Sequence, residues 1–150
     1  LGGINFDSVI IADFDESLKS VATSLLYTDV SSKRISYLTL NQWFDKSLLK
    51  ETSLHPIYFP SVNKENYNLF INEYNSLYRS NPNQLSFLSY DLIGLVYFLL
   101  YDNDFKVSKK IFYKKNKFKG KIGIFEINKN LITHQLNFYV IKNGKFKEIF

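Results

Sequence analysis

The stretch Gln84–Asp102, QLSFLSYDLIGLVYFLLYD, constrains the fold most, because its centre, Leu92–Tyr101, is ten residues long and carries no charge. A helix that crosses a bilayer needs about 20 mostly apolar residues. The uncharged run is half that length and lies between Asp91 and Asp102. Apolar residues occupy every face of the helix it would form, which is typical of a helix inside a protein. We therefore expect a fully buried core helix rather than a membrane span.

The composition is typical of a globular domain with its own core. The chain has 150 residues, of which 45% are hydrophobic and 22% are charged. It contains no cysteine, which excludes disulfides and thiolate metal sites. It also contains no methionine and begins at Leu1. We expect a mature or excised piece of a longer product, with any signal peptide or lipid anchor upstream.

The net charge of +5 is concentrated in one segment. Residues 106–121, KVSKKIFYKKNKFKGK, carry eight lysines and no acid, and the other residues have a net charge of −3. Lysine outnumbers arginine 17 to 2, although arginine is the residue that makes bidentate contacts to phosphates and bases. The segment could bind anionic lipid, peptidoglycan, nucleic acid or nothing, and the aromatic residues between its lysines would suit a nucleic-acid surface. We nevertheless expect a solvated segment anchored by its aromatic side chains, and no nucleic-acid partner.

Apolar patterns along the chain predict strands and helices in turn. Strands are expected over residues 7–14, 34–40 and 55–61, helices over 15–25, 63–79 and 84–102, and three further strands over 122–150. In this last region Asn143-Gly144 is a strong two-residue hairpin signal. Strands that alternate with helices predict a parallel sheet with helices on its faces. The expected fold class is therefore α/β: a three-layer parallel sheet flanked by helices, with a C-terminal β-hairpin.

In parallel sheets of this kind, ligands bind beyond the carboxyl ends of the strands. Six candidate ligand-binding residues are expected there: Asp13, Phe14, Asp15, Asn41, Gln42 and Trp43. Asp13 and Asp15 could share acid–base chemistry, but aspartate at such a position more often caps a helix, and we expect Asp15 to do so. Trp43, the only tryptophan, could stack on a ligand or cover the edge of the sheet.

No motif in the chain points to catalysis or to a bound metal. A glycine-rich phosphate loop and a G-x-S-x-G elbow are absent. His55 and His134 have no partner residues at ligand spacing, and a zinc site requires three or four ligands. We therefore expect a protein that is not an enzyme, with no catalytic residue, no metal site and no cofactor.

Several short sequence segments occur in the order that is typical of a known protein family. Residues 57–100 contain a strand that ends in an aromatic residue and proline, then spaced aromatic residues, a proline, and a helix with a Tyr-Asp pair. After the strand, the residues that match this pattern are Phe70, Tyr74, Tyr78, Pro82, Tyr90 and Asp91. Together with residues 6–27, 35–49 and 120–150, this order resembles the C-terminal part of a type I periplasmic binding protein, and is most similar to the bacterial penicillin-binding protein activators. Thr39-Leu40-Asn41 departs from the family pattern, in which this loop usually begins with glycine.

The resemblance implies one truncated bilobed domain in the periplasm or cell envelope. Residues 1–80 would be strand and helix units of the second lobe. Residues 81–122 would cross near Asn81 into the first lobe, supply its buried helix and carry the lysine-rich segment. Residues 123–150 would be the closing hairpin strands. Most of the first lobe would then be absent from the chain.

The resemblance also implies a function: a non-enzymatic binding or regulatory domain that contacts a peptidoglycan synthase. An alternative is a solute-binding protein that carries an amino acid or a similar small ligand, held in an interlobe cleft, for an ABC-type transporter. A basic nucleic-acid module is a third hypothesis, and it predicts binding that falls steeply with salt. We expect no transmembrane segment in this chain, and homo-oligomers in solution, because a half-fold would expose lobe surface.

Overall fold

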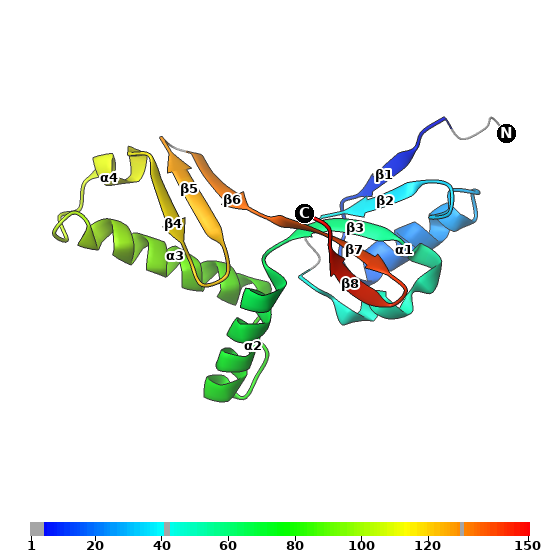
Figure 1. Ribbon diagram of the computed structural model, residues 1–150, viewed down its shortest axis with the longest axis horizontal. Coiled ribbons are helices and arrows are strands. Elements are labelled where there is room, and N and C mark those ends of the chain that lie inside the picture. The colour runs from blue at the N-terminus through cyan, green and yellow to red at the C-terminus, as the bar shows by residue number, and fades with distance from the viewer. Residues whose placement is uncertain (1–4, 41–42, 130) are drawn as a thin grey trace. The chain divides into compact units, whose positions relative to one another are not determined.

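The computed structural model describes residues 5–40, 43–129 and 131–150. The chain divides into two compact units (Figure 1). The first comprises Leu1–Ser61 and Asn137–Phe150, and the second is Val62–Leu136. The chain therefore passes between the units at Ser61–Val62 and again at Leu136–Asn137, whereas the sequence resemblance places a crossover near Asn81. The three segments expected from the sequence divide the chain differently, because the helix after residue 63 belongs to the second unit and residues 123–150 are shared by both.

A five-stranded mixed sheet forms the first unit. Its elements are β1 (Ser8–Ile11), α1 (Asp15–Leu26), β2 (Ser36–Thr39), the 3-10 helices η1 (Lys46–Lys50) and η2 (Thr52–Leu54), β3 (Ile57–Ser61), β7 (Asn137–Lys142) and β8 (Lys145–Glu148). The strand order is β1-β2-β3-β7-β8, with β1, β2 and β3 parallel and β7 antiparallel to both of its neighbours.

The mixture of helices and strands is confirmed, and the expected parallel sheet is confirmed in part: β1, β2 and β3 run parallel, but the sheet is mixed because β7 is antiparallel to both of its neighbours. Ser61, the last residue of β3, pairs with Asn137, the first residue of β7, so the chain re-enters the sheet at the same end at which it left and β7 runs antiparallel to β3. Asn143 and Gly144, with φ of 53° and 67°, join β7 to β8, as the hairpin signal predicts. Residues 122–150 form four strands rather than three, divided between two sheets.

Aromatic rings fill the core of the first unit. Phe59 alternates inward along β3 and is fully buried, as is Tyr139 opposite it on β7. Their rings stack with centroids 5.8 Å apart. Phe44 packs edge-on against Tyr139 at 4.9 Å and against Phe146 at 5.5 Å. Because Phe44 lies in the segment that follows β2, this packing ties that segment to the sheet.

The second unit combines helices with a three-stranded antiparallel sheet. Its elements are α2 (Lys64–Tyr78), α3 (Gln84–Tyr101), α4 (Lys109–Tyr113), β4 (Asn116–Lys119), β5 (Ile124–Asn128) and β6 (Leu131–Gln135), with strand order β4-β5-β6. The Asn63 side chain caps α2 by accepting from the Asn66 amide at 3.0 Å, and Asn83 caps α3 in the same way. The lysine-rich segment is not only solvated chain, because it forms α4 and β4.

The helix α3 is not fully buried, contrary to the prediction. Phe87, Asp91, Leu95 and Leu99 are buried at four-residue spacing, and Leu95 and Leu99 pack against Ile127 of β5. The other faces remain largely exposed, because the sheet covers one side of α3 and α2 packs only on its first turns, where Phe70 contacts Phe87 and Tyr90; Ile93, for example, is 70% exposed. α3 is also the single helix, within the described part of the chain, that is long and apolar enough to span a membrane by length and composition.

We expect Phe59→Ala to reduce the free energy of unfolding of the first unit by about 3–5 kcal/mol, because it removes a fully buried ring and leaves a cavity among Phe44, Tyr139 and Phe146. Urea titration followed by the fluorescence of Trp43, which lies in this unit, measures the change. Tyr27→Ala, at an 89% exposed position, is the control and should change stability by less than about 0.5 kcal/mol. Equal midpoints for the two variants would contradict this account of the core.

Candidate functional site

The candidate residues expected from the sequence follow the carboxyl ends of two parallel strands. Ile11 of β1 pairs with Thr39 of β2 in register, so the chain leaves both strands at the same edge of the sheet. Asp13 and Phe14 follow β1, and Trp43 follows β2. Parallel strands place their carboxyl ends at one edge, which is where such sheets bind ligands. We call the residues Asp13, Phe14, Asp15 and Trp43 the strand-end site.

Asp15 does not cap the helix, contrary to expectation. The N-cap of α1 is Phe14, which has extended backbone and makes no side-chain capping bond. Asp15 is the first residue of α1, with φ of 48°, and it is exposed. The Asp13 carboxylate turns back on the chain and accepts from the Phe14 amide at 2.9 Å. With Glu16, Asp15 places negative charge in the first turn of α1, where the helix dipole favours it.

The sequence leaves two roles open for Trp43, stacking on a ligand or covering the edge of the sheet, and its position in the structure is compatible with both. Its side chain is half-buried and its φ is 48°. The next residue, Phe44, is the one that enters the core, so Trp43 is held at the edge by its neighbour's packing. Asn41 and Gln42, the remaining two candidates, lie outside the described residues.

The strand-end site combines groups suited to binding. Phe14 is 41% exposed and offers an apolar ring beside the Asp15 carboxylate. Thr39 and Ser61, the last residues of β2 and β3, are buried and line the same edge from within. Among the residues that the structure describes, no group of three or more His, Asp or Glu side chains comes together as a metal site.

A second polar centre, in the second unit, lies around the buried carboxylate of Asp91. This side chain is 2% exposed and projects from the buried face of α3. Its Oδ1 accepts from the Lys121 amide at 2.7 Å, and its Oδ2 accepts from the amides of Ile122 and Gly123 at 3.0 and 3.1 Å. A carboxylate is stable in such a place only when hydrogen bonds replace its water. Asp91 thus joins α3 to the β4–β5 turn.

Two glycines make room for this arrangement. A Cβ added to Gly120 would lie 2.4 Å from the Asp91 carboxyl carbon, and one added to Gly123 would lie 1.9 Å from Nε2 of His134. His134 stacks on Phe125, its partner across β5 and β6, with centroids 4.3 Å apart. Its Nε2 is buried without a hydrogen-bond partner among the described atoms. Burial lowers the pKa of His134, and the Asp91 charge partly opposes that shift.

The same turn reaches α2 through Lys121. Its ammonium pairs with the Glu73 carboxylate and lies 5.8 Å from the centre of the Tyr90 ring. The hydrogen bond to Glu73 raises the pKa of Lys121, while desolvation opposes the rise. Through its backbone and its side chain, Lys121 therefore contacts both α3 and α2.

Sequence reasoning noted Asp91 only as a boundary of the apolar run and as half of a Tyr-Asp pair. The missed signal was an acid one residue before an uncharged helical run, together with the two glycines of Gly120-Lys121-Ile122-Gly123. An acid on the buried face of a helix needs donors, and a glycine-bounded turn can supply amides at close range. The pairing itself spans about 30 residues, so only the tertiary structure reveals it.

We expect Asp91→Ala to lower the free energy of unfolding of the second unit by about 3 kcal/mol or more, because three backbone amides, two of them in buried hydrogen bonds, lose their acceptor. Native-state hydrogen exchange should show residues 121–123 losing most of their protection. Asp102→Ala, an exposed acid just beyond the end of α3, is the matched control and should leave exchange unchanged. Full protection of these amides in Asp91→Ala would show that the carboxylate does not hold the turn.

We expect the stability of the second unit to fall as the pH drops below about 6.5, the ordinary pKa of histidine, because folding lowers the pKa of His134. The unfolded chain then binds the proton more tightly than the folded one. The loss ends once the pH passes below the lowered folded-state pKa. His134→Phe keeps the stack on Phe125 and should abolish this decline in pH-dependent unfolding, whereas Gln135→Ala should preserve it. An NMR titration of His134 with a midpoint at or above 6.5 would contradict the prediction.

The chain matches no protein-family model, no curated protein and no solved structure at a significant level. The function is therefore inferred from the residues and the topology of this chain.

Proposed function

We propose that the chain is a non-enzymatic binding domain of the cell envelope, akin to the penicillin-binding protein activators, which contacts a peptidoglycan synthase through the strand-end site. The observation that carries the proposal is the edge formed by the parallel strands β1, β2 and β3. It presents an exposed ring, Phe14, and a half-buried one, Trp43, beside carboxylates. Aromatic anchors with flanking polar groups are typical of protein-binding surfaces.

The path of the chain also supports kinship with the type I periplasmic binding proteins. The chain leaves the first unit after β3, forms the second unit over residues 62–136, and returns as β7. A family of bilobed proteins whose chain crosses between lobes accounts for that path. We infer that β1–β3 and α1 correspond to part of a three-layer lobe of this family. A place in the periplasm follows from the same kinship.

We expect Phe14→Ala to weaken binding to a purified peptidoglycan synthase from the source organism by about tenfold or more, because an exposed aromatic anchor is lost. Surface plasmon resonance with the immobilised synthase measures the dissociation constant. Tyr27→Ala, which removes an exposed ring at the opposite end of α1, should bind as the unaltered chain does. No binding by the unaltered chain at micromolar concentration would overturn the proposed function, and equal affinities for the two variants would exclude the strand-end site.

The acidic residues at this edge favour one second candidate, an amino-acid-binding protein. Asp13 is half-buried and Asp15 is exposed, so either carboxylate could receive a ligand's ammonium group. A thermal-shift screen with amino acids distinguishes the two functions: a rise of several degrees in Tm with one of them, lost in Asp15→Asn, supports solute binding.

A further inference from the structure

An apolar trough runs along α3 in the second unit. Two hollows, of about 260 and 170 Å³, lie between α3 and the β5–β6 hairpin and share Leu92, Leu95 and Ile132 in their walls. The α4 side chains Phe112 and Tyr113 line one end, together with Lys129. Leu92, Ile132 and Tyr113 are each more than half exposed, so this apolar surface is open.

Further apolar side chains are exposed in the turn beyond the end of α3. Val107 is 79% exposed in the turn between α3 and α4. Phe105 is also exposed, and its ring packs edge-on against Tyr97 and Tyr101 of α3. We call the trough together with Phe105 and Val107 the α3–α4 face. Exposed apolar surface of this kind marks a site of interaction.

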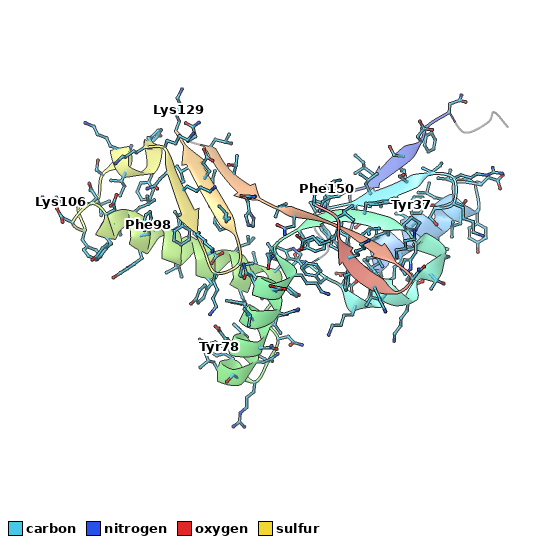
Figure 2. The ribbon with its side chains drawn as sticks, in the orientation of Figure 1. Tyr37, Tyr78, Phe98, Lys106, Lys129 and Phe150 are labelled. Atoms are coloured by element: carbon cyan, nitrogen blue, oxygen red, sulfur yellow. The ribbon has the colours of Figure 1, made fainter. Side chains whose placement is uncertain are left out.

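Lysines border the α3–α4 face. The segment 106–121 carries eight lysines and no acid. Lys115 pairs with Glu126 and Lys121 with Glu73, while the other six make no ion pair with any described residue. Figure 2 labels Lys106, in the turn after α3, and Lys129, in the β5–β6 turn. Lys109, Lys110 and Lys114 lie on α4 or at its end, beside Phe112 and Tyr113.

We propose that the α3–α4 face binds the surface of an anionic lipid bilayer. The aliphatic and aromatic side chains enter the boundary between headgroups and acyl chains, and the lysine ammonium groups pair with headgroup phosphates. Apolar residues flanked by lysines are the combination that holds a protein in this interfacial zone. The proposal is independent of the strand-end site, which belongs to the first unit.

Two other occupants fit the chemistry less well. Single-stranded nucleic acid would use the lysines and aromatic rings, but it would leave the aliphatic side chains of Leu92, Val107 and Ile132 without a partner. A second copy of the chain would cover the apolar surface, but in a symmetric dimer the same patch meets itself. The lysine-rich segment would then face its own copy, and like charges would oppose the contact.

The test is co-sedimentation of the intact chain with vesicles of pure phosphatidylcholine or with about 30% phosphatidylglycerol, in about 0.1 M salt. We expect binding to the anionic vesicles alone. The triple variant Lys109→Gln, Lys110→Gln, Lys114→Gln should bind about a hundredfold more weakly, since each lysine near a charged surface contributes about fivefold. The matched control, Lys142→Gln, Lys145→Gln, Lys147→Gln, removes the same charge from the exposed β7–β8 hairpin and should bind nearly as well as the unaltered chain.

A second pair of variants tests the apolar contribution. Phe105→Ser with Val107→Ser should weaken vesicle binding at least about tenfold, because buried acyl-chain contacts are lost, whereas Tyr27→Ser in the first unit should not. The circular dichroism of each variant should match that of the unaltered chain. Equal loss in the two lysine triple variants, no binding to anionic vesicles, or tighter binding to a single-stranded oligonucleotide than to vesicles would each overturn the proposal. So would a dimer that forms without lipid and is broken by Phe105→Ser with Val107→Ser.

Discussion

One buried carboxylate organises the second unit. Asp91 lies on the packed side of an otherwise apolar helix, where a charge without partners would be strongly destabilising. Three backbone amides of the β4–β5 turn satisfy it, and those amides can approach only because Gly120 has no side chain. The position of the turn then sets where β4 and β5 cross α3. The packing of Leu95 and Leu99 on Ile127 follows from that placement.

Within the second unit, the sheet covers α3 on one side only. A single antiparallel sheet cannot enclose an 18-residue helix that is apolar all round. The open surface is bordered by lysines, which keep it soluble and give it a preference for anionic partners. The exposed side chains of α3 and the lysines of the following segment thus belong to the same surface, although they are separate features in the sequence.

The first unit is organised by its aromatic core rather than by a buried charge. Its aromatic core anchors the segment after β2 through Phe44, so that Trp43 is held at the carboxyl edge of the sheet without being drawn inside. Asp13 satisfies the Phe14 amide and leaves the Phe14 ring exposed. Packing of Phe44 and the Asp13 hydrogen bond thus hold the backbone beside two aromatic side chains, Trp43 and Phe14, at this edge of the sheet.

Local signals in the sequence determined the elements that depend on local chemistry. Apolar patterns predicted β1, β2, β3 and α2, and Asn143-Gly144 predicted the β7–β8 turn, since each of these depends on neighbours within a few residues. The tertiary structure alone decided that β7 joins β3 antiparallel, that α3 buries a single face, and that Asp91 finds its donors 30 residues away. It also decided that Phe14, not Asp15, is the cap of α1. Hydropathy reports how apolar a segment is, but the partner that covers it comes from elsewhere in the chain.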